Sequence, residues 1–277
     1  MKIIKNLSRI IINNLVRIFL ISLFPLFLIL FSFKSRYRLS IINFSKSYMF
    51  LIKNPKYINI NLKIFIWIVK SWKRKELDYG RGFLYQSYEN IGLYGLRATN
   101  KKINLIKNFI NLKNKKILDI GSNSSFLSVE VAKKANFVDC VEPNKYLIKQ
   151  GQTVADFFKL LNMNFYETKF EQFYTNNKYS TVLSFANHST YDGETEYSLD
   201  EYFYKISNLL IERGSLLFES HHPLIEKDIS DVKNCISKYF DIKEEIIVEG
   251  GNFIDNGRTW LLCKKLIDGV EKDDHLN

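Results

Sequence analysis

KILDIGSNSSF, residues 116–126, and VDCVEP, residues 138–143, decide the fold. Together they read as an apolar strand, a turn with one glycine, a helix, and a second strand that ends in an acid. In α/β proteins, backbone N–H groups at the first strand-to-helix turn meet polar atoms of a nucleoside cofactor, and the acid meets ribose hydroxyls. The acid here is Glu142, 23 residues beyond Asp119 (142 − 119).

The glycine pattern of this turn indicates which cofactor fits. A dinucleotide site needs bare glycines so that a pyrophosphate and a helix can approach closely. Only Gly121 is present, and Asn123 and Ser125 stand where the later glycines would fall. A cofactor that lacks pyrophosphate therefore fits better.

These residues resemble motif I of the class I S-adenosylmethionine (SAM)-dependent methyltransferases, in the variant with asparagine in place of the middle glycine. The resemblance continues in order through Glu142, YSTVLSFANHST at 179–190 and NLLIERGSLLFESHHP at 208–223. It implies SAM as the cofactor and an α/β fold, with a seven-stranded, mostly parallel, Rossmann-like sheet and helices on both faces. Because SAM is made in the cytoplasm, the resemblance also implies that the catalytic domain faces the cytoplasm.

The resemblance assigns cofactor-binding residues. The turn at Gly121 would hold the methionine part, and Glu142 would hold the ribose. Many relatives place an acid after the third strand to bind adenine, but Lys169 occupies that position here. Adenine recognition is therefore expected to rest on backbone groups near Thr168 and Phe170, or on Glu171. The predicted cofactor-binding residues are Asp119, Gly121, Ser122, Asn123, Glu142, Pro143, Phe170 and Phe185.

Histidines follow two of the predicted parallel strands, whose carboxyl ends share one edge of the sheet. His188 follows the fourth strand, and His221 and His222 follow the fifth. A neutral imidazole can take a proton near pH 7. The predicted catalytic residues are His188 and His221, as base or substrate ligand, and Asn187, which would orient the cofactor or the acceptor. The alternative for each histidine is a hydrogen-bonded residue that organises a loop.

Cysteines and histidines do not form a metal motif. Cys140, Cys235 and Cys263 are too few and too scattered, and Cys140 and Cys263 lie in apolar strand patterns typical of a core. A divalent ion held by the three histidines with Asp192 or Glu219 is an alternative, but no metal is predicted.

Predicted elements complete this domain. The predicted strands lie at 164–166, 181–185 and 215–219, with a hairpin of 242–248 and 259–264. The predicted helices lie at 100–111, 124–135, 144–161 and 199–211. Ser198 and Glu201 form a capping-box pattern at the start of the last helix, and Gly214 is expected to end it.

Charge is distributed unevenly along the chain. Residues 1–75 contain 15 Lys and Arg and no Asp or Glu, and the rest contains 40 − 15 = 25 basic against 29 acidic residues. A nucleic-acid site needs clustered Lys and Arg, so nucleic acid is not an expected partner of the catalytic domain, whose substrate is expected to be a small molecule, lipid or glycan. The predicted organisation is a basic, hydrophobic, helical arm at 1–78, the methyltransferase domain at 79–267 and a polar tail at 268–277.

The arm is predicted to bind an anionic membrane surface through residues 10–75. IFLISLFPLFLILFSF, residues 18–33, carries no charge, but as a helix it is about 24 Å long, shorter than the ~30 Å hydrocarbon core. We interpret it as an interfacial or re-entrant anchor kinked at Pro25. The alternatives are a span extended back to Ile10 with Arg17 snorkelling, or a buried helix pair. The apolar stretch from Ile60 to Trp72 fits the headgroup layer, or packs as a helix on the domain.

RGFLYQSYENIGLYGLRAT, residues 81–99, precedes the first predicted helix of the domain. Because many methyltransferases close such a segment over SAM, Tyr85, Gln86, Tyr88 and Arg97 are candidate lid residues. The leading functional hypothesis is a membrane-associated methyltransferase acting on an O or N acceptor. The alternatives are an RNA methyltransferase that uses the basic arm, and a non-catalytic SAM-binding scaffold.

Overall fold

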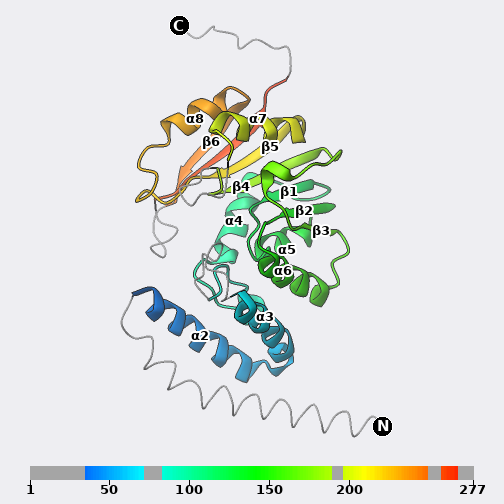
Figure 1. Ribbon diagram of the computed structural model, residues 1–277, viewed down its shortest axis with the longest axis vertical. Coiled ribbons are helices and arrows are strands. Elements are labelled where there is room, and N and C mark those ends of the chain that lie inside the picture. The colour runs from blue at the N-terminus through cyan, green and yellow to red at the C-terminus, as the bar shows by residue number, and fades with distance from the viewer. Residues whose placement is uncertain (1–34, 72–82, 189–195, 249–256, 268–277) are drawn as a thin grey trace. The chain divides into compact units, whose positions relative to one another are not determined.

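The computed structural model describes residues 35–71, 83–188, 196–248 and 257–267 (Figure 1). The chain divides into two compact units, Met1–Lys102 and Ile103–Asn277. The predicted anchor at 18–33, Asp192 and the polar tail at 268–277 lie outside the described residues. Among the helices that the structure describes, none combines the length and the apolar character that crossing a membrane requires.

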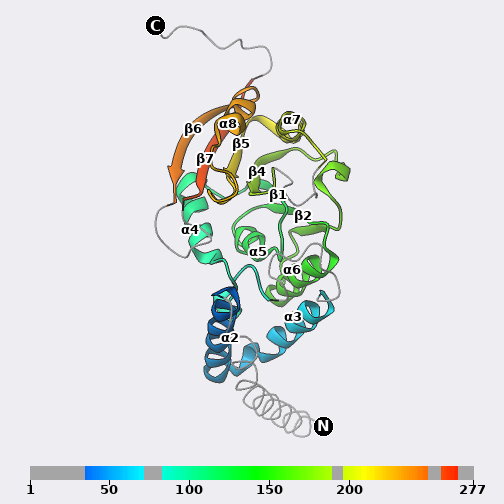
Figure 2. The same ribbon diagram turned by 60° about the vertical axis from the view of Figure 1, so that its left-hand side comes forward.

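In the first unit, helices α2 (Ser35–Lys53) and α3 (Ile58–Ser71) are joined through the short 3-10 helix η1 (Pro55–Tyr57) (Figure 2). Two buried asparagines tie these helices to the segment that follows. The Nδ2 atom of Asn43 donates to the carbonyl of Gly95 (2.7 Å), and that of Asn61 donates to the carbonyl of Ile91 (2.8 Å). Helix α3 therefore packs one face inside this unit.

The candidate lid residues lie in this first unit, around the 3-10 helix η2 (Glu89–Ile91). Isolated bridges join Gln86 to Arg97 and Tyr88 to Leu93. The Arg97 N–H donates to the carbonyl of Tyr85 (2.7 Å). Their role as a lid stays a prediction.

The second unit is built on a seven-stranded sheet of order β3-β2-β1-β4-β5-β7-β6 (Figure 1). Strand β7 runs antiparallel to both of its neighbours, and the other strands are parallel to one another. The predicted seven-stranded, mostly parallel sheet is confirmed. The strands are β1 (Lys116–Ile120), β2 (Phe137–Val141), β3 (Met163–Tyr166), β4 (Tyr179–Phe185), β5 (Leu210–Glu219), β6 (Phe240–Ile247) and β7 (Thr259–Lys265).

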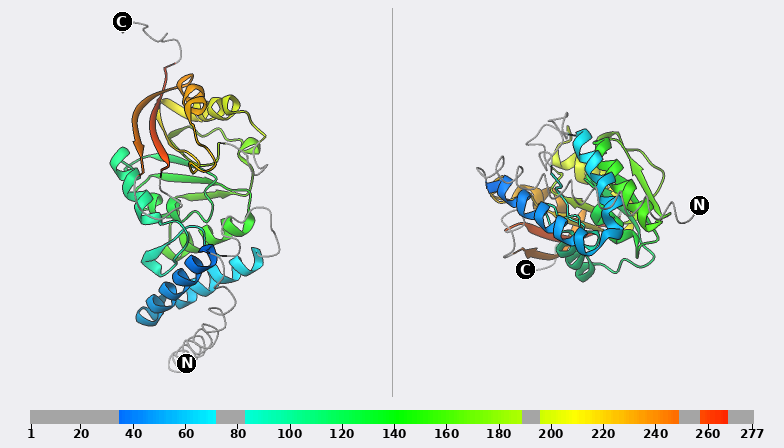
Figure 3. Two further views of the ribbon diagram at one scale, coloured as in Figure 1. Left: turned by 90° about the vertical axis from the view of Figure 1, so that its left-hand side faces the viewer. Right: turned by 90° about the horizontal axis from the view of Figure 1, so that it is seen from below.

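Helices cover both faces of this sheet (Figure 3). One face carries α4 (Thr99–Phe109), α5 (Phe126–Ala132) and α6 (Lys145–Phe158), and the other carries α7 (Leu199–Leu209) and α8 (Ser230–Ser237). One hydrophobic core cluster lies under α7 and α8, where Phe203, Ile206 and Ile236 pack with strand residues such as Val182 and Phe218. Sheet and helices thus hold the strand ends of the second unit in place.

The start of α7 confirms the capping-box prediction, but its end does not match. Ser198 Oγ accepts the Glu201 N–H (3.3 Å), and Glu201 Oε2 accepts the Ser198 N–H (2.8 Å). The helix ends at Leu209, two residues before the predicted end, because Leu210 already pairs with Tyr179 of β4. Gly214 therefore lies inside β5, beside a register shift, where an added Cβ would come within 2.8 Å of the Ile211 carbonyl oxygen.

A buried polar pair gives a stability prediction for this sheet. Tyr179 donates its hydroxyl to Oδ2 of Asp139 (2.5 Å), whose other carboxylate oxygen has no hydrogen-bond partner among the described residues. Burial, and then this hydrogen bond, raise the pKa of Tyr179. Tyr179→Phe is expected to lower the free energy of unfolding by about 2–3 kcal/mol, because a buried carboxylate loses a donor.

Urea unfolding of the full chain measures this loss. The matched control is Tyr174→Phe, since Tyr174 is 84% exposed and should change stability little. Equal stabilities of the two variants would contradict the prediction.

Candidate active site

In the bend after β1, residues 121–125, three residues adopt the left-handed backbone conformation that glycine favours, although only Gly121 is a glycine. Gly121 has φ 61°, and Asn123 and Ser125 both have φ 53°, in the left-handed region. That region costs an ordinary L-residue roughly 1–2 kcal/mol. Local hydrogen bonds offset part of this cost: Asn123 Oδ1 accepts the Ser124 N–H (2.8 Å), and the hydroxyls of Ser122 and Ser125 lie 2.9 Å apart.

Glu142 lies against this bend. One carboxylate oxygen, Oε2, accepts the Asn123 N–H (2.9 Å), and the other, Oε1, accepts the Asn144 N–H (3.0 Å). Asn144 in turn caps helix α6, where its side-chain oxygen accepts the Tyr146 N–H (2.9 Å). The residues predicted to hold the methionine part and the ribose are thus adjacent, and Pro143 lies between Glu142 and the cap.

Asn187 reaches the same bend from the end of β4. Its Nδ2 atom donates to the carbonyl of Ile120, and an added Cβ on Gly121 would lie 2.6 Å from that Nδ2 atom. The Oδ1 atom of Asn187 is buried and has no hydrogen-bond partner among the described residues. Buried polar atoms are almost always bonded, so this oxygen is an acceptor that a donor group of a ligand at the bend would satisfy.

His188 and His221 meet at the ends of β4 and β5, as their positions predicted. Their ring centroids are 4.7 Å apart, and the His188 ring also packs 4.8 Å from that of Phe218. His188 Nε2 lies 2.8 Å from Oε1 of Glu226. The other carboxylate oxygen of Glu226, Oε2, accepts the backbone N–H of His221 (2.9 Å). Burial raises the pKa of Glu226. The hydrogen bond and the charge of His188, together with the backbone hydrogen bond and the charge of His221, outweigh burial and hold this pKa below its usual range.

Sequence reasoning missed Glu226. It lies seven residues beyond the end of β5 (226 − 219), in a segment without a recognisable motif, and its contact with His188 spans 38 residues. Gly151 of α6 was also missed. An added Cβ there would come within 2.8 Å of the Ser125 Cβ atom, so this glycine lets α6 approach the bend.

His222 has a different place from the other two histidines. Its Nδ1 atom accepts the Leu224 N–H (3.1 Å), which organises the turn after β5. Among the residues that the structure describes, no group of three His, Cys, Asp or Glu could hold a metal ion.

Asp119, Phe170 and Phe185 are engaged with the protein itself. Asp119 accepts a hydrogen bond from the Ser128 hydroxyl of α5. The Phe170 ring packs 5.3 Å from that of Tyr202 in the core, and the Phe185 ring packs 4.9 Å from that of Trp260. For Phe170, the predicted adenine contact can therefore come only from its backbone, whose carbonyl already accepts Lys205 Nζ (2.7 Å).

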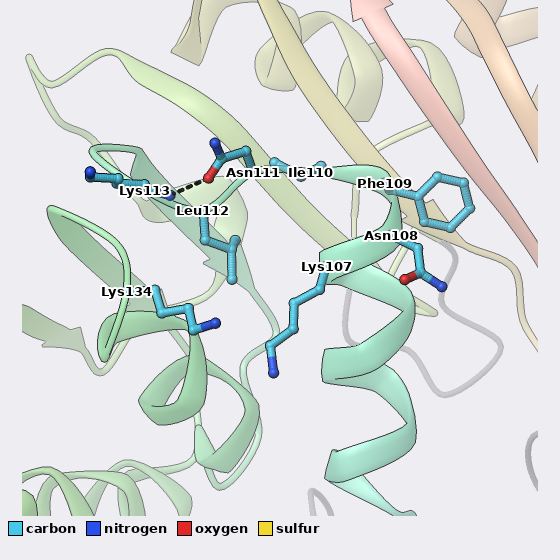
Figure 4. A pocket seen from close by; sticks show the side chains of 8 residues that line it. All are labelled: Lys107, Asn108, Phe109, Ile110, Asn111, Leu112, Lys113 and Lys134. Carbon is cyan, nitrogen blue, oxygen red and sulfur yellow. Dashed lines mark hydrogen bonds between the residues drawn. The ribbon is translucent and has the colours of Figure 1, made fainter.

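A hollow of about 620 Å³ lies at the opposite, amino-terminal edge of the sheet. It is formed by the end of α4 and the loop into β1, and Lys134 enters it from beyond α5 (Figure 4). Lys107 lies in the last turn of α4, where a cation stabilises the helix dipole. Its charge therefore has a structural reason, and the hollow is separate from the bend. The lining residues are Lys107, Asn108, Phe109, Ile110, Asn111, Leu112, Lys113 and Lys134.

No protein-family model matches the sequence, and no curated protein matches it. Solved structures do match its fold. The N-methyltransferase NodS from Bradyrhizobium japonicum WM9, in complex with S-adenosylhomocysteine, is 9% identical with a TM-score of 0.51, and the match covers 73% of this chain and 98% of that one. A putative SAM-dependent methyltransferase from Listeria monocytogenes is 14% identical with a TM-score of 0.51, and that match covers 61% and 100%.

The chain has the class I methyltransferase fold. Identities of 9% and 14% establish the fold alone, because one fold can carry many functions. The reaction must therefore be inferred from the residues around the bend.

Proposed function

We propose that the protein is a SAM-dependent methyltransferase that methylates an O or N acceptor on a small molecule, lipid or glycan at a membrane surface. The observation that carries the proposal is the bend at Gly121, with its left-handed Asn123 and Ser125, held against Glu142. The structural neighbour NodS, solved with S-adenosylhomocysteine, supports the choice of cofactor.

The residues present fit SAM. Its cationic amino group is a hydrogen-bond donor, and the buried Oδ1 of Asn187 beside the bend is an acceptor without a partner among the described residues. Each Glu142 oxygen accepts one backbone N–H, and a carboxylate oxygen can accept more than one hydrogen bond, so a ribose hydroxyl can bond to it as well. When bound, SAM would supply an electrophilic methyl group on a sulfonium.

The chain's own residues then orient and enclose the reaction. Asn187 fixes the geometry between β1 and β4, since its amide bonds the carbonyl of Ile120. His188 follows it directly and offers a proton acceptor at the same edge. Against the scaffold hypothesis, the bend keeps the conformation that glycines would give it, so the missing glycines are no sign of a degenerate site.

Calorimetric titration of SAM into the full chain tests the proposed activity at its first step. Binding at one site, with NAD failing to bind, is the expected result. A protein whose folding is confirmed by circular dichroism, but which does not bind SAM, would overturn the proposal.

The proposed membrane contact is supported by the first unit. Helix α3 buries Ile60, Ile64 and Ile68, while Phe65 (45% exposed), Ile66 (50%) and Val69 (37%) remain at the surface. Lys70 lies over the Trp67 ring, 4.5 Å from its centroid. Exposed apolar side chains beside lysines suit the headgroup layer of an anionic leaflet. Because SAM is made in the cytoplasm, we infer that the catalytic unit faces that compartment.

Liposome flotation of the full chain checks this contact. Replacing Phe65, Ile66 and Val69 together by serine should weaken partitioning about 30-fold, since burying three half-exposed apolar side chains contributes about 2 kcal/mol. Leu161→Ser is the matched control, because Leu161 is 97% exposed in the second unit. Equal partitioning of the triple variant and the control would contradict a role for α3 in membrane binding. In a separate assay, RNA binding that falls steeply as the salt concentration rises would favour the RNA alternative.

A further inference from the structure

His188 and Glu226 form a buried pair where the segments after β4 and β5 meet. The His188 side chain is fully buried, and the Glu226 side chain is 13% exposed. His188 Nε2 lies 2.8 Å from Glu226 Oε1, and the backbone N–H of His221 donates to Glu226 Oε2 (2.9 Å). Both partners are therefore fixed in orientation.

The second ring nitrogen of His188 separates a structural role from a chemical one. Nδ1 is buried and has no hydrogen-bond partner among the described residues. A histidine that only joined two loops would have both nitrogens bonded, because a buried polar atom left unpaired costs about 1–3 kcal/mol. A ligand atom that donates a proton would satisfy this nitrogen.

Glu226 decides which nitrogen of His188 carries the hydrogen. An ionised carboxylate only accepts hydrogen bonds, so neutral His188 must carry its hydrogen on Nε2 and leave a lone pair on Nδ1. The same carboxylate stabilises the imidazolium that forms when Nδ1 takes a proton. Position and charge of Glu226 thus prepare His188 as a base.

We propose that Nδ1 of His188 is the base that deprotonates a hydroxyl acceptor, and that Glu226 is the positioning residue that sets its tautomer. The inference rests on the proposed methyltransferase function and narrows its acceptor to oxygen. A neutral amine attacks with its own lone pair, whereas a hydroxyl becomes a good nucleophile as it loses its proton.

The step balances without another reactant. The acceptor oxygen forms a bond to the methyl carbon while the bond from that carbon to sulfur breaks, and sulfur keeps the electron pair. The hydroxyl proton passes to Nδ1, which makes His188 an imidazolium paired with Glu226. A later loss of that proton to water restores the base.

Nitrogen NMR of full-length protein labelled at histidine tests the tautomer directly. The chain has four histidines, so a His188→Gln spectrum assigns the His188 signals. With S-adenosylhomocysteine present, the wild-type protein should show a protonated Nε2 and a bare Nδ1. Glu226→Gln should move the proton to Nδ1, because the new amide donates to Nε2, and Glu245→Gln, at a surface ion pair with Lys233, should change nothing.

The wild-type spectrum tests the tautomer even if Glu226→Gln fails to fold, because a proton on Nδ1 of His188 overturns the inference.

Phenol and aniline, matched in size, serve as probe acceptors in an assay of S-adenosylhomocysteine release. Faster release with phenol, reduced about 100-fold or more by Glu226→Gln, supports the inference, and faster release with aniline overturns the oxygen acceptor. Calorimetry separates the two proposals. SAM binding together with a proton on Nδ1 of His188 contradicts only the base proposal, whereas absence of SAM binding contradicts the proposed function.

Discussion

Glu142→Gln is expected to weaken SAM binding about 10- to 100-fold. The carboxylate accepts backbone N–H groups from Asn123 (2.9 Å) and Asn144 (3.0 Å), which holds it beside the bend. A hydrogen bond to a charged group contributes about 1.5–3 kcal/mol, and the glutamine amide would also face a backbone N–H with a second donor. Ribose recognition and the local geometry therefore fail together.

Calorimetric titration of SAM measures this effect, with Glu130→Gln as the matched control. Glu130 forms a surface pair with Lys133, and surface pairs contribute little, so that variant should bind SAM like the wild-type protein. Unchanged affinity in Glu142→Gln would mean that the acid after β2 does not meet the ribose.

Gly121→Ala is expected to abolish most SAM binding and to destabilise the protein. Its φ of 61° costs alanine about 1–2 kcal/mol. The new Cβ would lie 2.6 Å from Asn187 Nδ2, so Asn187 must give up its hydrogen bond to Ile120, worth about 1 kcal/mol. The free energy of unfolding should fall by about 2–3 kcal/mol, and SAM affinity by at least about tenfold, because the Asn187 acceptor moves away from the bend.

Gly257→Ala separates backbone strain from loss of the site. Gly257 also has a positive φ, 77°, and an added Cβ would lie 2.8 Å from Pro223 Cγ. It should lose stability in urea unfolding, yet keep its affinity for SAM. The account of Gly121 is wrong if both variants keep that affinity.

The sheet and the contact between Glu142 and the bend were predictable because they depend on local patterns. Apolar strand runs, one glycine and an acid at the next strand end placed Glu142 beside the bend, and the structure confirms that contact. The conformation of Asn123 and Ser125 was not predictable, since left-handed backbone favours glycine and only their local hydrogen bonds compensate. Gly214 was misassigned because pairing of Leu210 with Tyr179 overrides a helix-stop pattern.

The partner of His188 was hidden for a different reason. Its contact with Glu226 joins two loops 38 residues apart, and no spacing rule links a histidine to an acid at such a distance. The histidines themselves were found because both follow parallel strands, whose ends must share an edge. Short motifs thus predict the edge at which these polar side chains gather, while long-range packing selects their partners.

A crystal structure of the full chain with S-adenosylhomocysteine tests the central claim most directly. We predict that the Glu142 carboxylate lies within hydrogen-bond distance of the ribose hydroxyls, and that Asn187 Oδ1 accepts from the amino group of the ligand. Ligand bound away from the bend, or ribose hydroxyls held by residues other than Glu142, would contradict the account.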